Sequence, residues 1–203
     1  GGQRKPTSSN CDEMKALVLG CGSIGLRHIG HLRQLGLSDS EIEAADPNPE
    51  ARERVKVRCG ISVQHDPEQA LDRRPDVVLV CTPAVTHVPV TLKALEAGAH
   101  VFVEKPLTVT REQLDEVVGA YGDSSAGEHA PIVMIGFNRR FAPQVVKLKS
   151  LLSSVSEPKS FVMTVNAGEI PADHWVQDPV QGGGRIIGEG CHFVDLLCFL
   201  AGS

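Results

Sequence analysis

The feature that most restricts how this chain can fold is its glycine run, Gly20-Cys21-Gly22-Ser23-Ile24-Gly25, which directly follows a segment of strand length at residues 15–19. Glycines at this spacing between a strand and a helix are typical of a turn that binds a dinucleotide. The first glycine permits the tight turn, the second lets the backbone approach the pyrophosphate, and the third lets helix and strand pack closely. The helix N-terminus then faces the phosphate charge. We predict cofactor contacts from Gly20, Gly22, Ser23, Ile24 and Gly25.

Apolar segments of strand length alternate with segments of helical period over residues 15–137. This alternation predicts an α/β fold with a Rossmann-type, doubly wound parallel sheet, because such apolar runs suit strands covered on both faces. Right-handed crossovers bring the strand ends at Gly20, Asp46, Cys81 and Glu104 to one carboxyl edge, where these sheets bind ligands. The expected strands are residues 15–19, 42–45, 61–63, 77–80, 101–103 and 132–137, and the expected helices are residues 24–35, 49–57, 67–71, 88–97 and 111–121.

The chain divides into three parts. Residues 1–13 are polar without apolar periodicity, so we expect a disordered leader. Residues 14–138 form the predicted dinucleotide-binding domain. From residue 139 the pattern changes, with helices expected at residues 143–152 and 191–200 around a β-rich stretch at 161–165. Because few residues remain and no closing strands follow, we expect 139–203 to be the beginning of a second, truncated domain.

Composition excludes several classes of partner. The net charge is −5 with acidic and basic residues mixed, so no basic stripe is available for nucleic acid. No apolar run approaches the roughly 20 residues that a membrane span needs, and no secretory signal is evident. The six cysteines are scattered without a Cys-x-x-Cys pair, which favours reduced thiols. We expect a cytoplasmic protein that binds a small molecule.

Asp46 ends the second expected strand, about twenty residues beyond Gly25, where a carboxylate accepts hydrogen bonds from ribose hydroxyls and repels a 2′-phosphate. This position favours NAD over NADP. Arg52 and Arg54 lie downstream and could reach back to hold a phosphate, so NADP stays open as the less favoured cofactor.

Two further strand ends carry polar residues. Thr82 and Pro83 follow the fourth expected strand, and we predict that they border the cofactor. His87 is either another cofactor contact or a polar residue at the helix start, because a lone histidine discriminates poorly. Glu104 and Lys105 bring a charged pair to the rim of the sheet, either as part of the cofactor site or as a solvated strand end.

Five motifs in order resemble the glucose-fructose oxidoreductase/inositol dehydrogenase family. They are the glycine run, residues 76–83, the Glu-Lys-Pro at 104–106, residues 136–141, and the glycine-rich stretches at 182–184 and 190–195. The resemblance extends over about residues 15–202. It implies an N-terminal Rossmann domain followed by an α+β substrate domain, mostly missing here, whose open sheet commonly joins subunits. A homo-oligomer is therefore expected for the full-length protein.

The resemblance also implies roles for individual residues. The lysine of Glu-Lys-Pro lies in the family's catalytic site, so Lys105 would hydrogen-bond the reacting hydroxyl, and His192 matches the proton acceptor. Many members carry an aspartate four residues before that histidine, where this chain has Gly188. Glu189 either substitutes for the aspartate in catalysis or faces away, because a shift of one residue turns a side chain by about 100° on a helix.

Other candidate substrate contacts follow the sixth expected strand. The resemblance puts Asn138 and Arg140 near cofactor or substrate, with a structural role at the domain junction as the alternative. Residues 166–175 resemble a subset of the family found within larger two-module chains linked to polysaccharide or nucleotide-sugar metabolism. Trp175, the single tryptophan, either lines a sugar site with its ring face or serves as a packing anchor.

These features predict an NAD(P)-dependent oxidoreductase that transfers hydride between nicotinamide and a secondary alcohol of a sugar, cyclitol or nucleotide sugar. A non-catalytic sensor of a dinucleotide or sugar on the same fold is the alternative, although retention of Lys105 and His192 argues against it. A metal enzyme is a third hypothesis, since His28 and His31, like Glu189 and His192, stand three residues apart. Neither pair has an evident third ligand, so no metal is expected.

Overall fold

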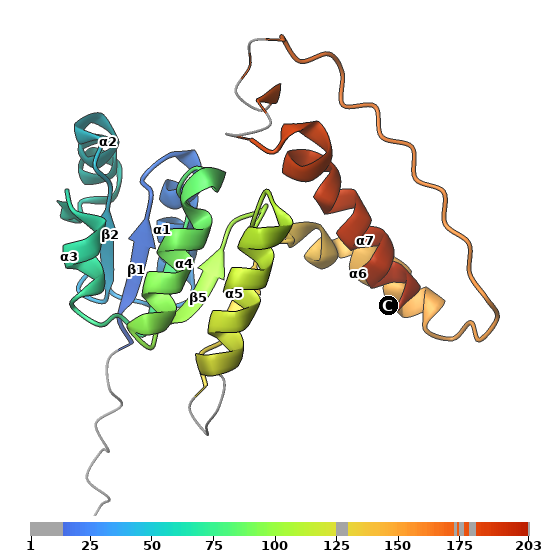
Figure 1. The fold of residues 1–203 in the computed structure, drawn as a ribbon, viewed down its shortest axis with the longest axis horizontal. Helices are drawn as coiled ribbons and strands as arrows, with labels where there is room; N and C mark the ends of the chain where they lie inside the picture. The colour runs from blue at the N-terminus through green and yellow to red at the C-terminus, as the bar shows by residue number, and fades with distance from the viewer. Residues whose placement is uncertain (1–13, 125–129, 173, 175–176, 179–181, 203) are drawn as a thin grey trace, which may run out of the picture.

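The computed structural model describes residues 14–124, 130–172, 174, 177–178 and 182–202, so the leader predicted at 1–13 lies outside the described residues. A six-stranded parallel sheet, in the order β3-β2-β1-β4-β5-β6, forms the first part (Figure 1). This arrangement confirms the predicted Rossmann-type sheet. The strands are β1 (Ala16–Leu19), β2 (Ile42–Ala45), β3 (Val63–Gln64), β4 (Val77–Val80), β5 (His100–Val103) and β6 (Val133–Ile135).

Helices cover both faces of this sheet, and β1 shows how the sequence produces that arrangement. Leu17 and Leu19 pack into the core formed with α3 (Pro67–Leu71) and α4 (His87–Glu96), whereas Ala16 and Val18 pack toward α1 (Ser23–Gln34) and α2 (Pro49–Cys59). All four side chains are buried. Full burial of a Val or Leu side chain contributes about 1.5–3 kcal/mol. The unbroken apolar runs therefore stabilise a sheet that is covered on both sides.

Side-chain caps set where two helices begin near the carboxyl edge. Asn48 Oδ1 accepts the backbone N–H groups of Glu50 and Ala51 at the start of α2. Asp66 does the same at the start of α3, and a proline follows each capping residue. Asparagine and aspartate suit the cap because their oxygens satisfy the free N–H groups of the first turn, and proline suits the next position because it lacks an N–H. The β2–α2 turn is thereby fixed beside Asp46.

Beyond β6 the chain leaves the sheet. A short 3₁₀ turn, η2 (Asn138–Phe141), leads into α6 (Pro143–Leu152), and a π-helical turn, η4 (Ile186–Gly190), leads into α7 (Cys191–Ala201). α6 and α7 lie side by side (Figure 1), joined by Lys149 Nζ, which donates to the Phe199 carbonyl at 2.6 Å. Both helices were predicted within one residue of their observed bounds. No helix in the described part of the chain is long and apolar enough to span a membrane.

The strand predicted at residues 161–165 is wrong. These residues are part of a long connection from α6 that passes outside the helices (Figure 1), and none of them belongs to a strand. A strand requires a neighbouring strand to pair with its backbone N–H and C=O groups, and no described strand pairs with residues 161–165. The side chain of Val162 is 94% exposed. The apolar pattern reflects strand propensity, but the described residues include no strand that pairs with this segment.

Candidate active site

The glycine turn between β1 and α1 has the geometry that its sequence predicts. Gly20 has a φ of +91°, and a Cβ there would meet the Cys81 carbonyl oxygen at 2.6 Å. A Cβ on Gly25 would lie 1.9 Å from the Gly20 carbonyl oxygen, so only glycine lets α1 approach this closely. Gly22, in contrast, faces open space, with no heavy atom within 4 Å of an added Cβ. The turn is therefore tight where it packs and open where a pyrophosphate would approach the helix N-terminus.

Asp46 lies beside this turn at the end of β2. Its Oδ2 accepts the Cys21 N–H at 2.6 Å, and its Oδ1 accepts the Asn48 N–H at 2.8 Å. These bonds orient the carboxylate, while each oxygen retains lone pairs for further donors such as ribose hydroxyls. Arg52 is committed to the same turn, because its Nη1 donates to the carbonyls of Asp46 and Pro47 at 2.9 and 2.8 Å.

A cleft of about 730 Å³ opens at this carboxyl edge and is lined mainly by apolar side chains. Seven of the predicted cofactor residues line it: Gly20, Gly22, Ser23, Ile24, Asp46, Thr82 and Pro83. Arg54 also reaches the cleft, whereas Arg52 does not. The volume, the open glycine turn and the carboxylate together fit the adenosine and pyrophosphate of a dinucleotide.

His87 does not line the cleft but is buried beneath the loop that does. Its side chain is only 2% exposed, with Nδ1 2.7 Å from the Pro106 carbonyl oxygen and Nε2 2.8 Å from the Thr82 carbonyl oxygen. It thus joins the cofactor loop after β4 to the Glu-Lys-Pro segment after β5. Of the two readings of this histidine, the structure favours a buried structural contact.

Glu104 and Lys105 lie just beyond the end of β5. Glu104 Oε1 is 2.8 Å from His28 Nε2, and His28 comes from the middle of α1. Burial alone would raise the pKa of Glu104, but the His28 hydrogen bond and charge, helped by the Lys105 N–H and charge, outweigh it. The pKa of Glu104 therefore lies below its usual value, and the carboxylate stays ionised.

Lys105 points toward η4, the turn that leads into α7. Its Nζ donates to the Gly188 carbonyl oxygen at 2.8 Å. Burial lowers the pKa of His192, and the positive charges of Lys105 and Arg139 lower it further, against opposing contributions from Glu104 and Asp195. His192 Nδ1 is buried without a hydrogen-bond partner among the described residues, and the ring makes an edge contact with Phe137. The structure thus brings Lys105 to the turn that immediately precedes His192, although the two residues are far apart in the sequence.

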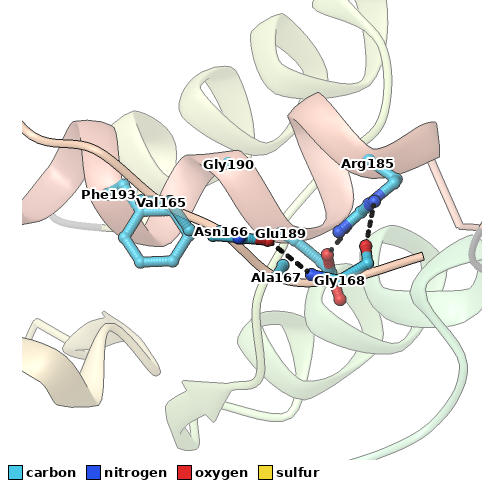
Figure 2. Close-up of a pocket in the computed structure, with 8 residues that line it drawn as sticks. All are labelled: Val165, Asn166, Ala167, Gly168, Arg185, Glu189, Gly190 and Phe193. Atoms are coloured by element: carbon cyan, nitrogen blue, oxygen red, sulfur yellow. Dashed lines mark hydrogen bonds and ion pairs between the residues drawn. The ribbon is translucent and has the colours of Figure 1, made fainter. Parts of the chain in front are cut away.

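Glu189 faces another direction. It lines a separate hollow with Phe193 and residues 165–168, and its carboxylate lies 3.4 Å from Arg185 Nε (Figure 2). Arg185 also donates to the Gly168 carbonyl at 3.2 Å. Of the two predicted alternatives for Glu189, this orientation matches the one in which it faces away from Lys105 and His192. The physical reason is the helical rotation between neighbouring residues.

The remaining predicted substrate contacts lie in different surroundings. Arg140 forms a two-pronged ion pair with Asp195, which is largely buried on α7, so it fastens η2 to that helix. This geometry favours the structural role predicted as its alternative. Asn138 is exposed at the start of η2. Trp175 lies outside the described residues.

Two cysteines at the carboxyl edge are poor nucleophiles. Burial, together with the nearby Asp46 carboxylate, raises the pKa of the Cys21 thiol to about 12, and burial also raises that of Cys81. Both thiols stay protonated at neutral pH. Among the described residues, no three His, Cys, Asp or Glu side chains are grouped so that they could hold a metal ion.

Sequence reasoning missed two contributors to this site. The sequence suggested His28 only as a partner of His31, yet His28 bonds Glu104. The available signal was its position about one turn after the glycine run, because that face of α1 packs on the sheet. The Gly188 carbonyl is a backbone atom, and no side-chain pattern reveals it.

Comparison with known proteins gives consistent results. Residues 14–126 match the model of an oxidoreductase family with an NAD-binding Rossmann fold. Inositol 2-dehydrogenase 4 of Saccharopolyspora erythraea is 33% identical over 142 residues, 69% of this chain and 41% of that protein. D-glucoside 3-dehydrogenase of Escherichia coli is 33% identical over 146 residues, 70% of this chain and 40% of that protein. The chain spans about half the length of the curated relatives it matches.

A solved structure extends the similarity beyond the sheet. GenD2 from gentamicin A biosynthesis, in complex with NAD, aligns with a TM-score of 0.74 and 25% identity over 99% of this chain and 57% of that one. The family match covers more than half of the chain, including the glycine turn, Asp46 and Lys105. This chain therefore belongs to the glucose-fructose oxidoreductase/inositol dehydrogenase family of oxidoreductases with an NAD-binding Rossmann fold.

Proposed function

We propose that the protein oxidises a secondary alcohol of a sugar, cyclitol or nucleotide sugar with NAD, or carries out the reverse reduction. The observation that carries the proposal is the hydrogen bond from Lys105, just beyond the end of β5, to the Gly188 carbonyl in the turn that leads into α7. His192 lies four residues further on, in the first turn of α7. His192 differs from the buried His87, since its Nδ1 has no hydrogen bond to the described protein. A buried ring nitrogen without a partner calls for an explanation, and a catalytic role is one that fits this residue.

Each residue has a distinct role in this reaction. When bound, the oxidised nicotinamide supplies the acceptor for the hydride that leaves the carbinol carbon. His192 accepts the hydroxyl proton, which its lowered pKa permits because the imidazole is neutral at physiological pH. The Lys105 ammonium donates to the same oxygen and stabilises the charge that develops on it. Glu189 takes no part, because it pairs with Arg185.

The substrate class rests on the named relatives. An inositol 2-dehydrogenase and a D-glucoside 3-dehydrogenase are among them, and both names describe oxidation of a ring hydroxyl. The test incubates the protein with NAD and a panel of cyclitols, glucosides and nucleotide sugars while the absorbance of the reduced nicotinamide is followed. Turnover of one class is expected. NAD binding without turnover of any member would favour the sensor alternative.

NAD is the proposed cofactor because the Asp46 carboxylate lines the cleft and Arg52 is held by backbone carbonyls. In Asp46→Asn the charge that repels a 2′-phosphate is lost, while one oxygen remains to accept one of the two backbone N–H groups that Asp46 binds. The ratio of NADP to NAD affinity should then rise by roughly 10- to 100-fold, the equivalent of about 1.5–3 kcal/mol for a charged contact. Calorimetric titration of both cofactors measures this ratio.

The control for that substitution is Asp72→Asn, at the end of α3, which removes the same charge away from the cleft. Its ratio of affinities should match that of the unchanged protein. If the unchanged protein bound NADP as tightly as NAD, the role given to Asp46 would be wrong.

The setting of the reaction is also proposed. Residues 14–138 would bind the cofactor, and residues 139–203 would begin a substrate domain through which the full-length protein self-associates. Exposed apolar side chains on α6, the connection and α7, such as Val146, Val162 and Val194, support further packing on this part. The free thiols of Cys21, Cys59, Cys81 and Cys191 suit the reducing cytoplasm. Light scattering of the purified protein measures its assembly.

A further inference from the structure

The ammonium of Lys105 is held by a backbone atom. Its Nζ donates to the Gly188 carbonyl at 2.8 Å, while the neighbouring Glu104 carboxylate bonds His28 instead. A carbonyl oxygen has two lone pairs, so it can accept a side-chain donor in addition to a helical N–H. Because a carbonyl carries no net charge, this contact fixes the direction of the ammonium without neutralising it.

The position of this carbonyl depends on a glycine. A Cβ on Gly188 would lie 2.4 Å from the Gly182 carbonyl oxygen, closer than real contacts allow. Gly190, two residues later in the same π-helical turn, has room, because its Cβ would meet the Arg185 carbonyl oxygen at an ordinary 3.6 Å. Single π-helical turns are often found at functional sites. The Gly182 backbone therefore presses against the one residue of this turn whose carbonyl contacts Lys105.

We propose that Gly188 is a positioning residue, whose carbonyl aims the Lys105 ammonium at the reacting hydroxyl and leaves its charge available to the developing alkoxide. The inference rests on the proposed function for the identity of that hydroxyl. The carbonyl of Gly188 acts through its dipole alone, and the close approach of the Gly182 carbonyl leaves no space for a side chain at residue 188. The full positive charge of Lys105 then acts on the reacting oxygen and on His192.

The test compares Gly188→Ala with Gly190→Ala in the whole protein. The new methyl group at residue 188 should displace the turn and withdraw the carbonyl from Lys105, whereas the same change at residue 190 fits existing space. A displacement of this kind should lower turnover by about 100-fold in Gly188→Ala. Turnover and NAD affinity should be unchanged in Gly190→Ala, and NAD affinity should also survive in Gly188→Ala, since neither glycine lines the dinucleotide cleft.

A second readout is the titration of His192 by NMR, assigned with His192→Gln. Four charged groups affect this imidazole, Lys105, Arg139, Glu104 and Asp195, and Gly188→Ala alters none of them chemically. Withdrawal of Lys105 should raise the His192 midpoint toward its ordinary value, as Lys105→Met should. Because both substitutions act through one contact, the double variant should titrate like Lys105→Met alone. Gly190→Ala should titrate like the unchanged protein.

Two results would overturn the proposal: a His192 midpoint in Gly188→Ala equal to that of the unchanged protein, or an equal shift in Gly190→Ala. If Gly188→Ala does not fold, a crystal structure of the unchanged protein with NAD decides, since Lys105 Nζ beyond hydrogen-bond distance of the Gly188 carbonyl also refutes it. Failure of the proposed function looks different. No substrate would be turned over, yet the titration shifts would still be observed.

Discussion

Lys105→Met is expected to lower turnover by about 100- to 1,000-fold, the usual effect of removing one donor to a developing oxyanion. Methionine keeps much of the length and apolar volume of lysine but has neither the charge nor the N–H groups. Lys105 does not line the dinucleotide cleft, so NAD affinity should change far less than turnover. Steady-state kinetics with the substrate found in the panel, together with NAD titration, separates the two effects.

The matched control is Lys93→Met. Lys93 lies on α4, where its exposed ammonium pairs with Glu68, and exposed ion pairs of this kind contribute little. Turnover and NAD affinity of this variant should equal those of the unchanged protein. Full turnover in Lys105→Met would contradict its catalytic role, and an equal loss in Lys93→Met would show that the assay reports general damage.

The sheet could be predicted from sequence because its determinants are local. The four residues of β1 are apolar at every position, which indicates burial on both faces, and both faces are indeed covered. The spacing from Gly20 to Asp46 could be predicted for a similar reason, since each residue terminates a strand. The strand expected at 161–165 failed because pairing depends on a neighbour that propensity does not encode.

The site was less predictable because several of its contacts use backbone atoms. The His87 ring lies between two carbonyl oxygens, Arg52 donates to two others, and Lys105 donates to the Gly188 carbonyl. A side-chain pattern gives no information about which carbonyl a distant loop presents. The helical turn around Glu189 is equally hard to predict. The Glu189 side chain faces Arg185, whereas the carbonyl of the preceding residue, Gly188, faces Lys105.

His192→Gln is expected to lower turnover by about 100- to 10,000-fold, the usual contribution of a general base. Glutamine keeps a polar group of similar size but does not accept the proton at neutral pH. The control is His31→Gln on the exposed face of α1, which should retain full turnover. Because the loss concerns the chemical step, NAD affinity should be nearly unchanged. Undiminished turnover in His192→Gln would transfer the role of base to another group.

The pH dependence follows from the direction of the His192 shift. Burial and the charges of Lys105 and Arg139 lower its pKa, so the neutral base persists below the ordinary value of about 6.5. The acid limb of kcat/KM for oxidation should therefore lie below pH of about 6.5 and should move upward in Lys105→Met.

The free energy of unfolding should also fall as the pH is lowered. The unfolded chain binds the His192 proton at a higher pH than the folded chain does, because the folded pKa is lowered. The contribution of His192 to stability is therefore complete above its unfolded pKa and is lost as pH falls through the folded one. Urea unfolding at several pH values should show a smaller loss of unfolding free energy at acid pH in His192→Gln than in the unchanged protein. In the kinetic measurement, an acid limb of kcat/KM above the ordinary histidine pKa would contradict the charge coupling on which the mechanism depends.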